Sequence, residues 1–501
     1  MRVAVTGATS DFGTAILPVL LDDPEIDGVL GLGRRPLRSS HPKLESVRMD
    51  IRDPKIEEVF RGCDAVVHLA FVVEEIRDKS ITHDINLRGS RNVIDSAARA
   101  GVRRVVIASS INAYGPDLHP EPVDESVYPA GDPVRYYFHD KAEVEHYAEW
   151  WMQRHPGEMF ISMLRPTYIV GPDFSNDGID QLTGSVGAFP QADVAAYQFL
   201  HQRDMADAFH RATKQDLVGP FNLGPREWVP VRELAAMQGQ KMFSVPEKPA
   251  IAIANLAFKL RLTPFSGQWV TAGEVVVDST RLSEATGWAP TLTAREAAAV
   301  MILLQGKALL RADAVPSRHV ACELAIEPAS AFVGIDGRDV EHVQLPVEGG
   351  SVHLEVHDGV TAGGTVVIPA PIGLHARYLT SVATELVTHG VNVVLVDLPG
   401  HGLSTGRRGH ALAGPVSLAL IAAEDFARRR FGGVPRTVRF GPPEPAHTSF
   451  LPAVSRRIRP VNPDDGLLPR RVRHDGGLAE LTAVGSVREA VDIVAGARLE
   501  A

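Results

Sequence analysis

Cysteine is nearly absent from this chain: Cys63 and Cys322 are the two among 501 residues. Two cysteines cannot build the disulfide scaffold of a small secreted domain. The first residues lead directly into a strand pattern with no secretory signal before it, so we expect a reducing, cytoplasmic location. Long apolar runs are also missing. Because a membrane-spanning helix needs about 18–20 apolar residues and Ala297–Leu304 is far shorter, we expect no membrane span.

Positive charge is in deficit as well. Lysine and arginine number 51 against 61 aspartates and glutamates, which gives a net charge of −10 at pH 7. A dedicated nucleic-acid-binding protein carries a basic patch or stripe, so we expect a small-molecule substrate and no nucleic-acid partner. The content of 45% hydrophobic and 22% charged residues is ordinary for a globular protein. At roughly 150 residues per domain, the length predicts two to four domains.

Residues 1–170 alternate short apolar runs with longer amphipathic stretches. The runs are rich in β-branched residues, lack strict alternation and are separated by helical segments. This pattern is typical of parallel strands covered on both faces, so it predicts an α/β fold with a doubly wound parallel sheet. The predicted strands are Val3–Val5, Val29–Leu32, Ala65–Ala70, Val105–Ala108 and Phe160–Leu164.

A second α/β unit follows a break in the pattern. Its predicted strands are Val340–Leu345, Ser351–Val356, Gly364–Ile368 and Val391–Val396, with a helix at Tyr378–Thr388. From Val434 to Asp475 proline and arginine dominate, which is a poor composition for a core. We therefore expect a first domain at 1–310 with a small substrate subdomain at about 171–300, a linker at 311–334, the second unit at 335–433, and an irregular tail at 434–501 with a terminal helix. Two hypotheses account for this C-terminal region: a degenerate module kept for binding or assembly, or out-of-frame sequence after Gly433.

A glycine-rich turn follows the first predicted strand and leads into a helix at Thr14–Leu21. Such a turn lets backbone amides approach a pyrophosphate, and the helix N-terminus adds partial positive charge. Gly7 permits the tight turn, Gly13 permits close packing of helix on strand, and Ser10 occupies the place of the usual middle glycine. A plain tight turn is the alternative. The residues expected to hold a dinucleotide here are Gly7, Thr9, Ser10, Asp11, Phe12 and Gly13.

The ends of the next strands carry further candidates. Arg34 and Arg35 close the second strand, where an acidic residue would bind a ribose 2′-hydroxyl and arginines suit a 2′-phosphate, so NADP is favoured over NAD. Two merely solvated arginines are the alternative. Asp50 ends the third strand and would lie near the adenine amino group. These positions are at carboxyl ends of strands, where open α/β sheets bind ligands.

Tyr137 and Lys141 are four residues apart on a predicted helix that starts near Pro133, which puts both on one face. An ammonium beside a phenol favours the phenolate and lowers its pKa, so Tyr137 could exchange a proton with a substrate hydroxyl or carbonyl. Ser110 closes the fifth strand and could hydrogen-bond the same substrate oxygen. A surface pair is the alternative for Tyr137 and Lys141.

Residues 1–305 resemble the extended short-chain dehydrogenase/reductase family, in its NAD-dependent epimerase/dehydratase branch with a Rossmann-type sheet. The resemblance implies Tyr137 as the acid/base, Lys141 on the nicotinamide ribose and Ser110 on the substrate oxygen. It also implies Pro166 beside the nicotinamide ring and Asn86 in the site floor, and two paired helices, at about 80–101 and 134–154, as a homodimer interface. The residues that carry it include Thr6, Gly7, Gly13, Asp50, Ile51, His68, Leu69, Ala70, Asn86, Ser110, Tyr114, Tyr137, Lys141, Arg165, Pro166, His201, Asp204 and Asn222.

Three features depart from the family. Ser10 replaces a phosphate-loop glycine, and Ile111-Asn112 stand where the dehydratases carry an acidic pair needed to eliminate water. The stretch from Gly171 to His201 is short and lacks the arginine of a nucleotide-binding segment. We therefore expect an NAD(P)-dependent oxidoreductase or epimerase that acts on a secondary alcohol or ketone, on a sugar, a nucleotide sugar or another carbonyl compound. A non-catalytic dinucleotide-binding scaffold or sensor is the alternative.

The second unit resembles the front of an α/β-hydrolase of the serine lipase/aminopeptidase type, over about residues 335–430. Thr365–His375 would be a strand with an oxyanion loop, and Asp397 and His401 follow the next strand. The Gly-x-Ser-x-Gly nucleophile elbow that should follow a later strand is missing. After Thr437–Phe440 come Gly441 and two prolines, which cannot form that strained turn. An esterase is thus a remote alternative, Asp397 and His401 are expected to be structural, and no metal site is expected.

Overall fold

The computed structural model contains two compact units, residues 1–174, 188–233 and 242–297 in the first, and residues 175–187, 234–241 and 298–501 in the second. No helix among the described residues is both long and apolar enough to cross a membrane. The structure describes residues 1–37, 41–73, 75–76, 78–117, 119, 121–171, 174, 179, 182–183, 186–238, 240–263, 266–270, 275–304, 340–359, 363–371, 375–406, 410–440, 473–474, 478, 481–484 and 487–496.

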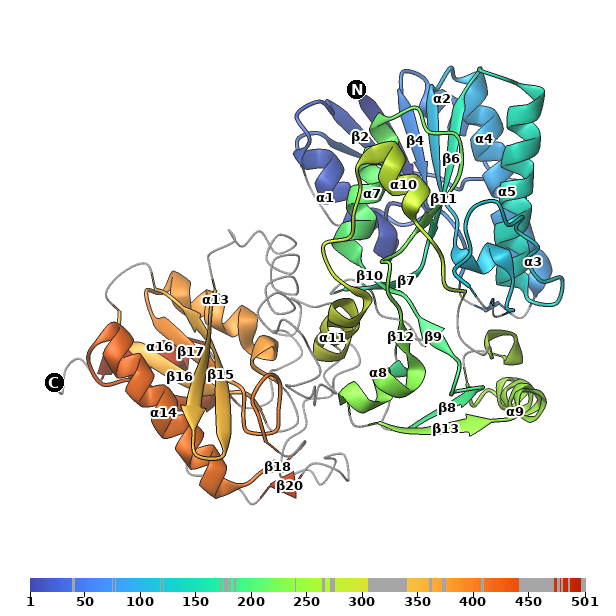
Figure 1. The fold of residues 1–501 in the computed structure, drawn as a ribbon. Coiled ribbons are helices and arrows are strands. Elements are labelled where there is room, and N and C mark those ends of the chain that lie inside the picture. Colours follow the sequence, from blue (N-terminus) through green and yellow to red (C-terminus); the bar gives the residue numbers. More distant parts are fainter. Residues whose placement is uncertain are drawn as a thin grey trace. The chain divides into compact units, whose positions relative to one another are not determined.

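The first unit is built on a seven-stranded sheet in the order β11-β6-β5-β4-β1-β2-β3 (Figure 1). Every pairing in it is parallel, which confirms the doubly wound parallel sheet. The central strands are buried along their length because helices cover both faces. The strands are β1 (Arg2–Thr6), β2 (Gly28–Gly33), β3 (Leu44–Arg48), β4 (Ala65–His68), β5 (Arg104–Ala108), β6 (Phe160–Pro166) and β11 (Gly219–Leu223).

Two groups of helices sandwich this sheet (Figure 1). On one face, α1 (Asp11–Asp22) packs against α7 (Gln202–Lys214). On the other face, α2 (Ile56–Phe60), α4 (Gly89–Arg99) and α5 (Tyr136–Arg154) enclose an apolar core that includes Phe60, Val93 and Trp151. Short turns lead into these helices: α3 (Lys79–His83) continues through the π-helical turn η1 (Asp84–Arg88) into α4, and η2 (Ile111–Tyr114) follows β5.

Small elements follow β6 at the carboxyl end of the sheet. β7 (Tyr168–Val170) pairs with β10 (Phe199–His201), and β9 (Ala196–Tyr197) pairs with β12 (Val229–Pro230). Helix α9 (Glu247–Lys259) has no buried residue, and η3 (Gly267–Trp269) packs against it. The remaining elements are β8 (Val186–Pro190), α8 (Val231–Gln238), β13 (Lys241–Val245), α10 (Thr280–Thr286) and α11 (Ala294–Leu304).

The second unit contains a six-stranded sheet in the order β14-β15-β17-β16-β19-β21. The first two pairings in this order are antiparallel and the others are parallel. This mixed sheet confirms the prediction of a second α/β unit, and it does not test the resemblance to a hydrolase. The strands are β14 (Glu341–Val347), β15 (Gly350–His357), β16 (Thr365–Pro369), β17 (Asn392–Val396), β19 (Arg436–Phe440) and β21 (Thr482–Val484).

Helices cover both faces of this second sheet. The turn η4 (Ala376–Leu379) leads into α13 (Thr380–Thr388), which shares one core with α16 (Val487–Gly496), while α14 (Ala413–Phe431) covers a second core. β18 (His410–Ala411) pairs with β20 (Arg473–His474). The segment 434–501, which its composition predicts to be irregular, thus supplies two strands of the sheet and a helix. Each is short, so its apolar residues hardly alter the composition of the whole segment.

Candidate functional site

The glycine-rich turn brings three backbone segments into close approach. Gly7 has φ +69°, and a Cβ there would lie 2.6 Å from the amide nitrogen of Ala70, just after β4. A Cβ on Gly13 would lie 2.5 Å from the carbonyl oxygen of Ala8. Real Cβ atoms do not approach so closely, so both positions require glycine. Ser10 is the N-cap of α1: its hydroxyl accepts the amide hydrogen of Gly13 at 3.2 Å.

The other predicted residues of the turn differ in their surroundings. Thr9 faces Gly33 at the end of β2, where a Cβ would lie 3.4 Å from the Thr9 hydroxyl. Asp11 is exposed in the first turn of α1. The Phe12 ring instead packs edge-on against Phe174 and Phe209, with centroids 5.5 and 6.0 Å away. Phe12 therefore anchors α1 to apolar neighbours, and the backbone is the part of this residue that faces the turn.

Some charged side chains near the ends of β2 and β3 are exposed, and others form ion pairs. Arg34 and Arg35 are exposed. Asp50 is bound in a bidentate manner by Arg52, at 2.9 and 2.7 Å, and the same guanidinium bonds Asp84 at 2.7 Å. The hydrogen bonds from Arg52 lower the pKa of Asp50 to about 2. Ile51 is buried against the place where Gly89 begins α4.

Lys141 and Tyr137 meet on one face of α5, as their spacing predicts. The ammonium of Lys141 is buried, donates to the carbonyl oxygen of Ala108 at 2.6 Å, and lies 5.7 Å from the centroid of the Tyr137 ring. It also lies 3.9 Å from the centroid of the Phe71 ring. Burial lowers the pKa of Lys141 to about 7, although Glu145 opposes this shift. The amino group of Lys141 therefore lies beside the Tyr137 ring, and its pKa is close to neutral pH.

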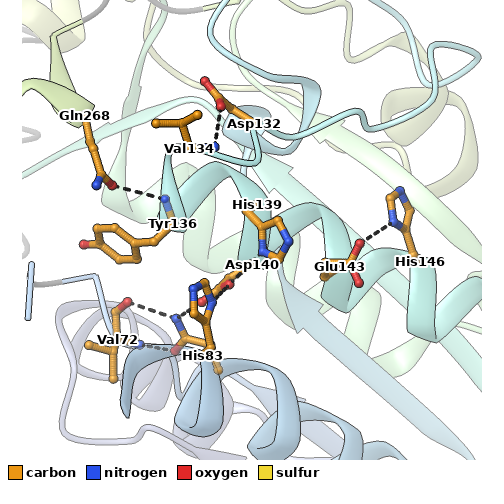
Figure 2. Close-up of polar contacts among 11 residues, drawn as sticks. Val72, His83, Asp132, Val134, Tyr136, His139, Asp140, Glu143, His146 and Gln268 are labelled. Carbon is orange, nitrogen blue, oxygen red and sulfur yellow. Dashed lines mark hydrogen bonds and ion pairs between the residues drawn. The ribbon is translucent and has the colours of Figure 1, made fainter. Parts of the chain in front are cut away.

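Aromatic rings frame Tyr137. Its half-buried ring lies 5.7 Å from the ring of Phe71 and 5.3 Å from that of Trp269, centroid to centroid. The backbone amide of Tyr136, the preceding residue, donates to the side-chain oxygen of Gln268 at 3.2 Å, as Figure 2 shows. The segment at 268–269 thus forms a wall beside Tyr137. Sequence reasoning missed this wall because Trp269 lies 132 residues after Tyr137 and no motif marks it.

Ser110 and its neighbours rest on a buried polar network. The Ser110 hydroxyl accepts the amide hydrogen of Asn112 at 3.2 Å and so caps η2. Beneath it, Glu145 and Arg165 form a fully buried ion pair with two Nε contacts of 3.0 Å. Arg165 also donates to the Tyr114 hydroxyl at 2.7 Å. Glu145 is a residue that sequence reasoning missed, and its signal was present: it follows Lys141 by four positions, on the same helix face.

The remaining predicted residues line the same strand ends. Pro166 is buried at the end of β6, and Leu69 and Ala70 directly follow β4. Asn86 is fully buried in η1: its side-chain oxygen accepts the Val72 amide at 2.8 Å, and its side-chain nitrogen donates to Asp140 at 3.0 Å. Asn86 therefore ties the loop after β4 to helix α5.

In the second unit, Asp397 is buried at the end of β17 and fully engaged. It accepts bonds from His353 at 2.9 Å, from the Ala376 amide at 2.7 Å and from the Leu403 amide at 2.9 Å. Burial raises the pKa of Asp397, but the hydrogen bond and charge of His353, the charge of His375 and the bond from the Leu403 amide together outweigh it and hold the pKa at about 2. A Cβ on Gly402 would collide with the carboxylate at 2.2 Å. This geometry is that of a loop anchor.

Comparison with known proteins matches residues 3–224 to the NAD dependent epimerase/dehydratase family. A protein of Sinorhizobium fredii named uncharacterized protein y4nG is 27% identical over 273 residues, covering 52% of this chain and 67% of that protein. N-acetyl-alpha-D-glucosaminyl-diphospho-ditrans,octacis-undecaprenol 4-epimerase of Escherichia coli O157:H7 is 29% identical over 174 residues, 34% of this chain and 49% of that protein. The chain thus spans about half the length of the second relative.

Two further similarities extend over more of the chain. UDP-glucuronic acid decarboxylase 5 of Arabidopsis thaliana is 26% identical over 324 residues, covering 60% of this chain and 88% of that protein. Among solved structures, MoeE5 in complex with UDP-glucuronic acid and NAD aligns with a TM-score of 0.49 and 20% identity, covering 60% of this chain and 97% of that chain.

Proposed function

We propose that this chain is an NAD(P)-dependent oxidoreductase or epimerase, because residues 3–224 match the NAD dependent epimerase/dehydratase family. It would move a hydride between a nicotinamide and a secondary alcohol or ketone of a sugar or nucleotide sugar. The names of two relatives, a 4-epimerase of a diphospho-linked N-acetylglucosaminyl lipid and a UDP-glucuronic acid decarboxylase, support this substrate class. The Ile111-Asn112 pair in place of two acidic residues makes a dehydratase the weaker proposal.

The single observation that carries the proposal is the buried ammonium of Lys141 behind the Tyr137 ring. A cation so placed stabilises the phenolate, so Tyr137 can accept the proton of a substrate hydroxyl. Ser110 accepts its own hydrogen bond from a backbone amide, which leaves its hydroxyl hydrogen for the substrate oxygen. The nicotinamide, when bound, supplies the hydride chemistry.

The chain's residues fit such a dinucleotide. The close approaches at Gly7 and Gly13 leave no room for side chains at these two positions of the turn before and at the N-terminus of α1, and a helix N-terminus suits a pyrophosphate. Ser10 caps the helix with its hydroxyl, so its side chain is directed to the Gly13 amide. We further propose that NADP is preferred, because Arg34 and Arg35 are exposed at the end of β2 while Asp50 is occupied by Arg52.

The catalytic role of Tyr137 is tested with Tyr137→Phe, compared with Tyr147→Phe as a matched control. Tyr147 lies on the same helix but donates to Asp95 at 2.7 Å. We expect Tyr137→Phe to lose at least about 100-fold in turnover on a sugar or ketone panel, with unchanged NADPH binding, and Tyr147→Phe to keep both. Equal turnover of wild type and Tyr137→Phe would refute the role. A wild type that binds NADPH and turns over nothing would favour the scaffold or sensor.

Cofactor preference is tested by titrating NADPH and NADH against nicotinamide fluorescence. We expect tighter NADPH binding, and an Arg34→Ala/Arg35→Ala variant that loses this preference while keeping NADH affinity. A wild type that prefers NADH would contradict the proposed 2′-phosphate site and keep the enzyme proposal intact.

Three wider proposals accompany this function. A homodimer would use the helices at about 80–101 and 134–154. The protein would be located in the cytoplasm, and the scarcity of cysteine supports this proposal. For the second unit, the three bonds received by Asp397 support a structural loop rather than a catalytic acid, so an α/β-hydrolase-like esterase is the weakest proposal. The place of a nucleophile elbow, after β19, lies outside the described residues.

A further inference from the structure

Two histidines and a carboxylate converge next to the active-site helix. His83 ends α3, and His139 and Asp140 lie in the first turns of α5 (Figure 2). The ligand atoms that these three residues offer all lie within 4.8 Å of one another. Within the described ranges, no other group of three histidine, cysteine or acidic side chains comes this close. The two elements that supply the residues are 57 positions apart in sequence, so the fold assembles the cluster.

The carboxylate of Asp140 is the fixed point of the cluster. Its side chain is fully buried, and the Nδ1 atoms of both His83 and His139 contact the same oxygen, Oδ1, the latter at 3.1 Å. The other oxygen, Oδ2, accepts a bond from Asn86 at 3.0 Å. Asn86 is itself held by the backbone amide of Val72 at 2.8 Å. The network therefore prevents the carboxylate from turning away and aims Oδ1 at the two imidazoles, as outer-shell partners do in metal sites.

The two imidazoles keep the cluster open to solvent. His83 and His139 are 36% and 35% exposed, and their ring centroids are 5.4 Å apart. We propose that His83, His139 and Asp140 form a binding site for a divalent cation of the zinc type. Two imidazole nitrogens, one carboxylate oxygen and an open position for water are a common donor set for Zn²⁺, and imidazole favours Zn²⁺, Ni²⁺ or Cu²⁺ over Mg²⁺ or Ca²⁺.

Binding would exchange protons for the metal. An imidazole Nδ1 that contacts a carboxylate shares a hydrogen with it, and ligation removes that hydrogen and places the cation between the two groups. Zinc–nitrogen and zinc–oxygen distances of about 2.0–2.2 Å put tetrahedral ligand atoms roughly 3.4 Å apart. The contact of His139 with Oδ1, at 3.1 Å, is near this value. The contact of His83 with the same oxygen is shorter, so the partly exposed ring of His83 would have to turn outward to admit the ion. The cation would then join α3 to α5, one residue before Lys141.

His146 supplies a matched control on the same helix. Its Nδ1 contacts Glu143 at 3.3 Å (Figure 2). Its Nε2 contacts the carbonyl oxygen of Pro129 at 2.8 Å, and its ring stacks on Tyr128. Among the described residues, His146 belongs to no group of three histidine, cysteine or acidic side chains that could hold a metal ion. Replacement of His146 removes a histidine of similar exposure without touching the cluster.

The test uses the full, tag-free chain after removal of metals with a chelator. Co²⁺ is titrated while the visible absorption of the ligated ion is followed, and Zn²⁺ is then added as a competitor. We expect one ion per chain with micromolar or tighter affinity, a loss of at least tenfold in affinity for His83→Ala and for His139→Ala, and no change for His146→Ala.

Far-ultraviolet circular dichroism and NADPH binding check the folding of each variant, and His83→Gln and His139→Gln replace any alanine variant that fails this check. Absence of binding to the wild type, or wild-type affinity in the His83→Ala/His139→Ala double variant, would overturn the proposal. Turnover and NADPH binding of the metal-free chain decide the proposed enzyme function separately.

Discussion

Replacing Glu145 with glutamine should destabilise the first unit severely. Its carboxylate and the Arg165 guanidinium are both fully buried and share at least three contacts, and the Ser109 hydroxyl donates to the same carboxylate. Glutamine keeps the shape but removes the charge, which leaves the guanidinium buried without its partner. Breaking a buried pair in this way costs about 3–5 kcal/mol. Since a domain is stable by only about 5–15 kcal/mol, the loss would be a large part of the total.

The assay is urea denaturation followed by tryptophan fluorescence. All five tryptophans of the chain lie between positions 150 and 288, within the first unit, so this signal reports the unit that contains the pair. The double variant Glu145→Leu/Arg165→Met serves as the comparison, because two apolar groups leave no unpaired charge and should recover part of the loss. A cost of under about 1 kcal/mol for Glu145→Gln, or a double variant as costly as the sum of its two single changes, would refute the reasoning.

Two further predictions concern the same unit. The pKa of Lys141 is about 7 in the folded chain and 10.5 in the unfolded one, so between these values the unfolded chain binds more protons and stability rises with pH, by at most about 1.4 kcal/mol per unit. The free energy of unfolding of the wild type minus that of Lys141→Met should therefore increase from pH 7.5 to pH 10. If urea titrations give the same difference at both pH values, the burial argument is contradicted. Gly13→Ala should weaken NADPH binding at least tenfold, because the added Cβ would collide with the Ala8 carbonyl oxygen at 2.5 Å. Gly28→Ala should leave NADPH binding unchanged, because the nearest atom to its added Cβ is 3.8 Å away. Equal NADPH affinities of the two variants in fluorescence titrations would show that the turn tolerates a Cβ at position 13.

Local patterns in the sequence determined most of the first sheet. Four of the five apolar runs predicted as strands fall within β1, β2, β5 or β6, with boundaries that differ by at most two residues at either end. The fifth run, Ala65–Ala70, contains β4 and extends two residues beyond its end. Burial on both faces demands continuous apolar residues in these strands, and that demand is visible in a short window. The glycines at 7 and 13 and the four-residue spacing of Tyr137 and Lys141 are equally local, since each follows from one turn or one helix face.

Partnerships between distant residues were decided by the tertiary structure alone. The ion pair of Arg52 with Asp84, the Glu145–Arg165 pair and the contact of His83 with Asp140 join different elements of the fold. Which side chains face one another across such elements depends on strand order and helix packing. The strands of the proline- and arginine-rich segment, β19 and β21, are a similar case, because they gain their stability from neighbours in the sheet and hardly at all from their own composition. Hydrophobic periodicity and turn chemistry depend on residues that are close in sequence, so the sequence shows them directly. The partner of a buried polar side chain depends on how the elements pack together, so only the tertiary structure shows it.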